Sequence, residues 1–370
     1  MNNRKAIGYI TANYTSEDKS VLTQSRPLAS LPFMGRYRLI DFPLSNMMNA
    51  GIKTVGVVLP TNYRSIVDHV GSGSPWGLDR KSGGMFLMPG NAFGTTKLGM
   101  RFLLRDMIAN KDLFLRADEP YVVMMGTNII FNMDLNELID AHEQSGAGIT
   151  MAYVKSERAH RNVMRLNLAD DGKVESIEYG TSYGDNKFID CFVINRDLLL
   201  QICDEFAAVD YLDLFEAVAN EYNRIDVRGY EFKGMAIGMF NERSYYHRSM
   251  EMLEPGVMDR LFIDDRPIMT KPHDTPPAKY SSGSVVRNSF VSAGCRIKGT
   301  VHGSMLSRNI IVEPGAYVSD SIIMQGCTIE SGARVENAIV DKNNVIAAQT
   351  EFRGTPDNIL IISKAPGSSK

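Results

Sequence analysis

The stretch DSIIMQGCTIESGARV, residues 320–335, decides the fold of the last part of the chain. In it a glycine twice stands three residues before a β-branched residue, and the same spacing occurs earlier. The pairs are Gly294/Ile297, Gly315/Val318, Gly326/Ile329 and Gly332/Val335. A six-residue rhythm of a turn glycine and an inward aliphatic side chain is typical of a parallel β-helix. The repeat therefore predicts a β-helix domain over residues 284–370, with open end coils suited to oligomer contacts.

The chain before the repeat alternates strand-like apolar runs with helical patterns. Residues 6–10, 54–59, 121–125 and 148–154 read as strands that are apolar on both faces, and residues 95–110, 135–146, 195–206 and 211–222 read as helices. Such strands are typical of parallel sheets covered by helices. The alternation predicts a doubly wound α/β domain over residues 1–253. Residues 254–283, with four prolines between 267 and 283, are predicted to be a linker.

Composition limits the classes of function. The chain has 370 residues and a net charge of −3, which gives no reason to expect nucleic acid or an anionic membrane as a partner. The sequence contains no run of 18 apolar residues, so it predicts no membrane span. The four cysteines are far apart and lack metal-ligand spacing. Buried free thiols in a reducing cytoplasm are the expectation.

Two segments resemble one known family. GRYRLIDFPLSNMMNAGIKTVGVV (35–58) and PPAKYSSGSVVRNSFVSAGCRIKG (276–299) are similar to the glucose-1-phosphate adenylyltransferases, also called ADP-glucose pyrophosphorylases. The resemblance implies a Rossmann-like, GT-A-like nucleotidyltransferase domain followed by a left-handed parallel β-helix of hexapeptide repeats. The family joins ATP to glucose 1-phosphate, releasing pyrophosphate and ADP-glucose. That chemistry needs a glycine-rich loop, cationic side chains and carboxylates that hold Mg²⁺.

The residues for that chemistry are missing at the matching positions. No glycine occurs between Gly8 and Gly35, where the family has its phosphate-binding loop, and Glu17 and Asp18 would repel a triphosphate. Five further positions depart from the family. Leu28 and Tyr179 replace lysines, Thr127 and Ala236 replace the two metal-binding aspartates, and Lys97 replaces an acid. The resemblance thus implies no bound Mg²⁺, no other cofactor and no catalytic residues of its own.

The family also offers a role for such a chain. Its divergent second subunits, of the GlgD type, assemble with a catalytic paralogue into a mixed tetramer in bacterial glycogen biosynthesis. The divergent subunit raises the activity of its partner and tunes the allosteric response. The run from Tyr63 to Arg80 is similar to that subgroup. Self-association of the chain on its own is a further expectation.

An effector site is implied between the two domains. Arg26, Arg38 and Arg308 match arginines with which the family holds sugar phosphates or similar anions. The alternative is that these arginines are solvated or form structural ion pairs. In particular, Asp41 could pair with Arg36 or Arg38.

Two other functions are open on the sequence. The chain could be a weakly active glucose-1-phosphate adenylyltransferase with a rearranged site. It could also be a hexapeptide acyltransferase, because His302 lies within the repeats and such enzymes use a histidine as a base.

Overall fold

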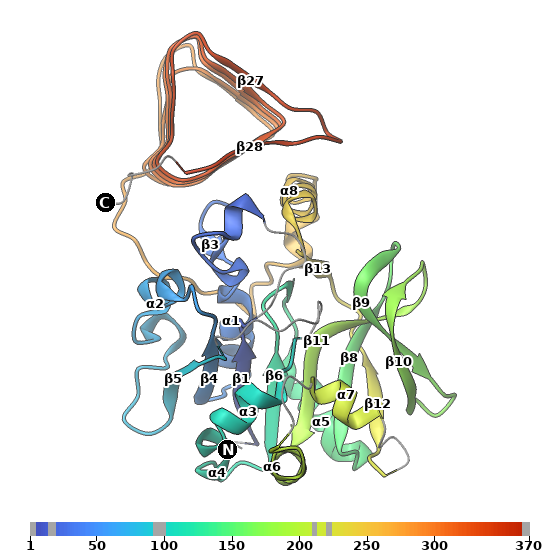
Figure 1. Ribbon diagram of the computed structural model, residues 1–370. Coiled ribbons are helices and arrows are strands. Elements are labelled where there is room, and N and C mark those ends of the chain that lie inside the picture. Colours follow the sequence, from blue (N-terminus) through green and yellow to red (C-terminus); the bar gives the residue numbers. More distant parts are fainter. Residues whose placement is uncertain (1–4, 14–19, 92–100, 209–212, 220–223, 365–370) are drawn as a thin grey trace.

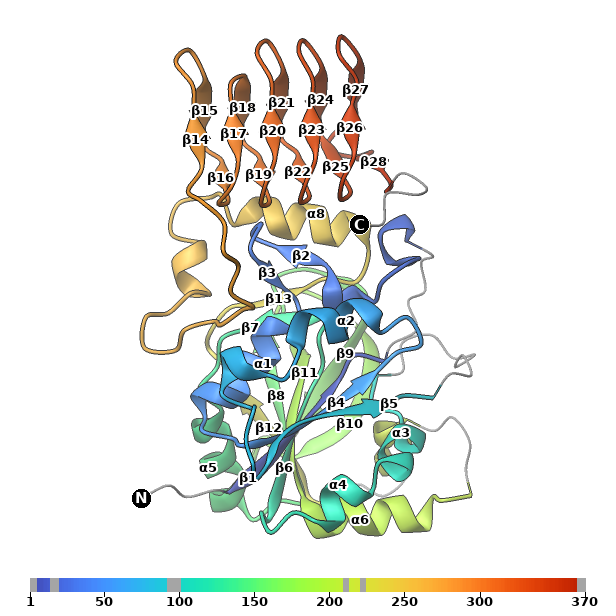
Figure 2. The same cartoon turned by 90° about the vertical axis from the view of Figure 1, so that its left-hand side faces the viewer.

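The computed structural model describes residues 5–13, 20–91, 101–208, 213–219 and 224–364. Figure 1 shows an α/β domain joined to a triangular prism of stacked coils, and Figure 2 shows the same coils from the side. This arrangement confirms the predicted nucleotidyltransferase-like domain followed by a left-handed parallel β-helix. Within the described residues, no helix has the length and apolar character needed to cross a membrane.

The centre of the α/β domain is a nine-stranded sheet with strand order β10-β9-β11-β6-β1-β4-β5, to which β8 and β12 are added through β11. The strands are β1 (Ala6–Thr11), β4 (Thr54–Leu59), β5 (Gly84–Pro89), β6 (Tyr121–Met125), β8 (Ile149–Lys155), β9 (His160–Leu168), β10 (Val174–Thr181), β11 (Asn186–Asn195) and β12 (Val227–Glu231). All four predicted strands are present. Two buried apolar clusters cover the two faces of the sheet.

The expectation of a parallel sheet is correct for β5, β4, β1 and β6, but wrong for the sheet as a whole. β11 runs antiparallel to β6, β8 and β9. β9 and β10 form an antiparallel hairpin whose turn contains Gly172, at φ +83°. A hairpin turn reverses the chain without a crossover helix, and the apolar pattern of a buried strand does not encode its direction.

The helices of this domain are α1 (Asp41–Asn49), α2 (Arg64–Val70), α3 (Leu104–Ala109), α4 (Asp112–Leu115), α5 (Leu135–Ser145), α6 (Arg196–Glu205), α7 (Leu214–Ala219) and α8 (Glu242–Glu251). Short 3₁₀ turns are η1 (Val21–Thr23), η2 (Leu28–Ser30), η3 (Ser74–Trp76) and η4 (Met258–Arg260). α5 is closed as predicted by Gly146, which is in the left-handed conformation.

The predicted helix over 95–110 is corrected. Residues 95–100 lie outside the described part, and the helix begins only at Leu104. The preceding residues are held in another conformation, because the Asp213 carboxylate accepts the backbone N–H groups of Arg101 and Phe102 at 3.1 and 3.0 Å. Leu103 also forms a β-bridge with Asp213. A tertiary contact thus overrides the local helical pattern.

The β-helix consists of three parallel five-stranded sheets. The first sheet contains β14 (Lys279–Tyr280), β17 (Arg296–Ile297), β20 (Ile311–Val312), β23 (Thr328–Ile329) and β26 (Val345–Ile346). The second contains β15 (Val285–Arg287), β18 (Thr300–His302), β21 (Tyr317–Ser319), β24 (Arg334–Glu336) and β27 (Glu351–Arg353). The third contains β16 (Phe290–Val291), β19 (Met305–Leu306), β22 (Ile322–Ile323), β25 (Ala338–Val340) and β28 (Leu360–Ile362). The first of these strands, β14, lies within the segment predicted as a linker.

The glycine rhythm has the predicted physical basis. The glycines at 294, 315, 326 and 332 all have φ between 72° and 77°, a conformation in which a Cβ atom is unfavourable. The aliphatic partners at 297, 318, 329 and 335 are completely buried inside the prism. All four cysteines are buried free thiols, as expected.

The two domains share one apolar interface. Figures 1 and 2 show α8 lying between the β-helix and the α/β domain, near the small hairpin of β2 (Pro32–Phe33) and β3 (Tyr37–Arg38). Phe33, Tyr245 and Met305 belong to a single buried cluster that includes side chains from both domains. Across this interface, the hydroxyl of Tyr246 donates a hydrogen bond to the carbonyl of Asp320 at 2.6 Å.

The hairpin turn approaches the β-helix closely at Gly35. A Cβ atom at this position would lie 2.4 Å from Ser292 Oγ and 2.9 Å from the backbone oxygen of Leu306. We predict that Gly35→Ala destabilises the protein more than Gly51→Ala. Both glycines have positive φ, and each substitution costs about 1–2 kcal/mol for that reason.

Gly51 is the matched control, because a Cβ atom there meets no atom within 4 Å. The clash at Gly35 adds about 1–3 kcal/mol to the loss in the free energy of unfolding. Thermal or denaturant unfolding of the two variants measures the difference. Equal losses would show that the close contact between the hairpin and the β-helix carries no energy.

Candidate functional site

The segment that follows β6 carries the first of the two positions that match the family's metal-binding aspartates. Thr127 and Asn128 follow the strand and are buried. The Asn128 carbonyl accepts the N–H of Met239 at 2.8 Å. Beyond it, β7 (Ile129–Phe131) pairs with β13 (Ala236–Gly238) in antiparallel fashion. Adjacent segments therefore carry the two positions, Thr127 and Ala236, that match metal-binding aspartates.

These residues do not fit a magnesium ion. Mg²⁺ is held in proteins by carboxylate oxygens, whereas Thr127 offers a neutral hydroxyl and Ala236 offers no donor atom. Nowhere in the described ranges do three His, Cys, Asp or Glu side chains gather as metal ligands would. The side-chain oxygen of Asn128 is buried without a hydrogen-bond partner, but a single neutral oxygen is not a Mg²⁺ site.

Tyr179 occupies the position that matches the lysine of the family's sugar-phosphate motif. It stands on β10, and partial burial of its hydroxyl raises its pKa to about 12, with a further contribution from Asp213. A neutral phenol cannot supply the charge that a lysine would bring to a phosphate.

A buried ion pair lies close to Tyr179. Arg101 Nη1 binds Asp190 Oδ1 at 2.5 Å, and the Arg101 guanidinium lies 5.3 Å from the ring centre of Phe240. Both charged side chains are almost fully buried. Arg101, whose charge acts on Tyr179, is therefore already neutralised by Asp190.

The remaining departures from the family lie against the interdomain apolar cluster or outside the described residues. Leu28 begins η2 and packs against the apolar cluster shared by the two domains. Its role here is packing. Glu17, Asp18 and Lys97 lie outside the described ranges.

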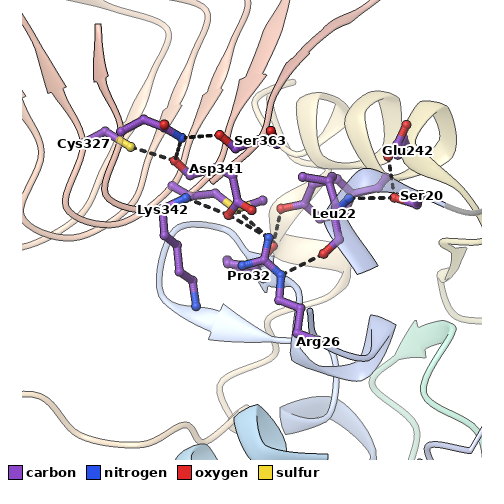
Figure 3. Close-up of polar contacts among 12 residues, drawn as sticks. Ser20, Leu22, Arg26, Pro32, Glu242, Cys327, Asp341, Lys342 and Ser363 are labelled. Atoms are coloured by element: carbon purple, nitrogen blue, oxygen red, sulfur yellow. Dashed lines mark hydrogen bonds and ion pairs between the residues drawn. The ribbon is translucent and has the colours of Figure 1, made fainter. Parts of the chain in front are cut away.

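Arg26 connects the two domains. Figure 3 shows its guanidinium between the loop near η1 and the β-helix. Arg26 Nη2 binds Asp341 Oδ1 at 2.7 Å, and Arg26 Nε donates to the carbonyl of Leu22 at 3.0 Å. Arg26 is 5% exposed, so this charge is engaged inside the protein. Of the two expectations for Arg26, this arrangement matches the structural ion pair.

Arg38 lies at the end of β3, where its Nη1 donates to the carbonyl of Ser65 at 2.6 Å. Burial lowers its pKa to about 10. The expectation that Asp41 pairs with an arginine side chain is wrong. One oxygen of Asp41 binds His69 Nε2 at 2.5 Å, and the other accepts the backbone N–H of Arg38 at 2.9 Å. Burial lowers the pKa of His69.

Lys342 has no signal in the sequence that singles it out, but the fold places it among cationic side chains. It lies between β25 and β26, next to Asp341, and burial lowers its pKa to about 7. The charges of Arg38, Arg26 and Arg308 lower it further. Burial and the charge of Arg36 also lower the pKa of Arg308. Arg36, Arg38, Arg308 and Lys342 are called the interdomain cationic cluster below. Like charges that depress one another's pKa values in this way are suited to an anion.

His302 lies on the outer face of β18 and is exposed. Its neighbours across the sheet are Arg287 and Ser319. Neither residue is a carboxylate that would orient the imidazole as a base.

The bond between Arg26 and Asp341 gives a prediction about stability. Arg26→Met leaves the buried Asp341 carboxylate without its cation and is expected to cost about 3–5 kcal/mol in the free energy of unfolding. The double variant Arg26→Met/Asp341→Asn is expected to lose less than the sum of the single losses. Equilibrium unfolding of the four proteins in this double-mutant cycle measures the coupling.

Arg116→Met serves as the control, because Arg116 pairs with Asp112 on the surface, where both side chains are more than three-quarters exposed. Its loss should stay below about 1 kcal/mol. Strictly additive effects of the Arg26 and Asp341 substitutions would mean that the two side chains do not stabilise each other.

Comparison with known proteins agrees with the fold. A family model described as nucleotidyl transferase matches residues 21–178, and one described as GlmU-like, C-terminal hexapeptide matches residues 276–355. The glycogen biosynthesis protein GlgD of Geobacillus stearothermophilus is 31% identical over 319 residues, which is 85% of this chain and 83% of that protein.

Two further relatives match over most of their length. The GlgD protein of Bacillus subtilis is 29% identical over 371 residues, covering 98% of this chain and 97% of that protein. The glucose-1-phosphate adenylyltransferase of Fervidobacterium nodosum is 27% identical over 350 residues, covering 93% and 84% of the two chains. The chain therefore belongs to the glucose-1-phosphate adenylyltransferase family, as a divergent member of its GlgD type.

Proposed function

We propose that this protein is a regulatory subunit without useful catalysis of its own, which acts in glycogen biosynthesis by assembling with a catalytic glucose-1-phosphate adenylyltransferase. The observation that carries the proposal is the neutral character of the positions that match the family's catalytic site. Thr127, Ala236 and Tyr179 stand where the family has two metal-binding carboxylates and a cationic side chain. Removing one preorganised electrostatic group costs about 10²–10³ in rate, and here several are absent together.

The interdomain cationic cluster supports a regulatory role. Its members come from both domains, with Arg38 on β3 and Arg308 and Lys342 in the β-helix. An anion held there contacts both domains at once, so its binding energy depends on how they are arranged. A sugar phosphate is the proposed effector, because its phosphate group satisfies several cationic donors together. Such a ligand shifts the protein toward the arrangement that it binds best.

The ends of the β-helix support assembly. The last coil presents β26, β27 and β28, whose outer edges pair with no further strand of the described chain. Val345 on this coil is 64% exposed. Open strand edges and exposed apolar side chains favour contacts with another subunit.

The proposal predicts a distinct pattern of activity. The purified protein alone should form no ADP-glucose above background when given ATP, glucose 1-phosphate and Mg²⁺. Added to a catalytic family member, it should form a mixed oligomer and raise the rate. Coupled assays and native mass spectrometry measure both properties.

Three outcomes would redirect the assignment. ADP-glucose formation by the protein alone that disappears on Arg101→Met would identify a weakly active enzyme. Failure to associate with any co-expressed catalytic relative would end the subunit role. Acyl transfer that requires His302 would instead identify an acyltransferase.

The low pKa of Lys342 gives a pH prediction for effector binding. Below a pH of about 7 its ammonium is charged and attracts an anion, and the charge is lost as the pH rises through that value. Measured relative to Lys342→Met, for which the ionisation of the phosphate is the same, the affinity for a hexose phosphate should therefore fall between pH 6 and pH 8. Lys342→Met should bind more weakly at pH 6 and lose most of this pH dependence. Isothermal titration calorimetry measures the affinities. A substitution of an exposed lysine, Lys279→Met, is the control. Identical pH profiles for Lys342→Met and the unchanged protein would exclude Lys342 from the site.

A further inference from the structure

A second cationic site lies in the α/β domain, around Lys187 at the start of β11. Lys187 is only 7% exposed. Among the described residues, no carboxylate oxygen lies within the 4.0 Å of its Nζ atom that would make an ion pair. Burial lowers its pKa to about 8. Burying an ammonium without a paired carboxylate has an unfavourable desolvation free energy. A bound anion would offset this free energy.

Two arginines from other elements lie near enough to Lys187 for their charges to lower its pKa. Arg158 follows the end of β8, and Arg248 lies on α8. Both bind Glu251, Arg158 at 3.3 Å and Arg248 at 2.6 Å, so this one carboxylate holds the two guanidinium groups together. The pairing of Lys155 with Asn186 brings the end of β8 beside the start of β11. The charges of both arginines act on Lys187.

The carboxylates around this group do not balance its positive charges. Glu251 is shared by the two arginines, and Asp190 is bound to Arg101. Glu157 is the other carboxylate that acts on Lys187, and it is exposed to solvent. His160 lies nearby, where burial and the three cations lower its pKa to about 4. Its neutral ring can donate or accept a hydrogen bond.

We propose that Lys187, Arg158 and Arg248 bind the phosphate group of a small metabolite. A tetrahedral oxyanion has acceptor atoms for donors that arrive from three sides, and guanidinium groups bind phosphate in a bidentate fashion. The side chain of Arg158 is 49% exposed whereas Lys187 is nearly enclosed, so the phosphate enters beside Arg158 and reaches Lys187 last. This site is separate from the interdomain cationic cluster and does not depend on the proposed regulatory function.

Phosphate titration of the full-length protein tests the assignment. Isothermal titration calorimetry with inorganic phosphate should show binding that weakens at least about tenfold in Lys187→Met, because one charge-assisted contact is lost. Lys155→Met is the matched control, since Lys155 is an exposed lysine on the neighbouring strand and should leave the affinity unchanged. Lys342→Met should also leave this binding event in place.

Two results overturn the assignment. One is an unchanged phosphate affinity in Lys187→Met. The other is phosphate binding that disappears in Lys342→Met alone, which would assign the anion to the interdomain cationic cluster. A hexose phosphate should bind to the Lys187 site at least as tightly as inorganic phosphate, and its exclusion would overturn the assignment to a metabolite.

A measurement on the unchanged protein covers the case in which Lys187→Met does not fold. Acetylation at pH 8, followed by mass spectrometry, reports the reactivity of each lysine. Phosphate should slow the modification of Lys187 and leave the exposed Lys279 of the β-helix unaffected. Equal rates at Lys187 with and without phosphate would contradict the proposal.

Discussion

The ion pair between Arg26 and Asp341 fixes how the two domains meet. Arg26 comes from the first loop of the α/β domain and Asp341 from the β-helix, and both side chains are almost fully buried. A buried pair of this kind repays its desolvation only when its geometry is good and its other polar atoms are satisfied. The pair is supported by further hydrogen bonds, because Arg26 also donates to the carbonyl of Leu22 and the Asp341 oxygen bound to Arg26 accepts the N–H of Lys342 at 2.6 Å.

The ion pair between Arg26 and Asp341 also affects the net charge of the interdomain cationic cluster, because it occupies a nearby carboxylate. Asp341 is committed to Arg26, and Asp41 is committed to His69. Two carboxylates that could have neutralised the cluster are therefore occupied, and the like charges of Arg38 and Arg308 lower the pKa of Lys342. The proposed anion would meet a cluster whose nearby carboxylates are already engaged in other contacts. The positions that match the family's catalytic site carry no such excess of positive charge. There Arg101 is neutralised by Asp190, and Tyr179 is uncharged at neutral pH.

The sequence predicts the parts of this structure that depend on local pattern. The turn glycines of the β-helix and the strand Tyr121–Met125 follow from periodicity, because their conformation is set by neighbours a few residues away. The helix expected over 95–110 is shortened by a contact with Asp213, more than a hundred residues later. The direction of β11 is likewise set by its partners in the sheet.

The same limit applies to the candidate site. The neutral residues Thr127, Ala236 and Tyr179 can be identified by comparing each position with the family motifs. The partner of Arg26 cannot be identified in this way, because Asp341 lies 315 residues further along the chain. Lys342 and Lys187 look like ordinary lysines in the sequence, and only the folded chain surrounds each of them with arginines.

The central claim is that this chain controls catalysis and does not perform it. The most direct test places it in a complex with a catalytic glucose-1-phosphate adenylyltransferase whose own metal-binding aspartate has been replaced by asparagine. Every active site in that complex then depends on this chain. We predict no ADP-glucose above background from the complex, with association between the subunits intact. Steady formation of ADP-glucose would contradict the account, because the cleft around Thr127 and Ala236 would then have to be catalytic.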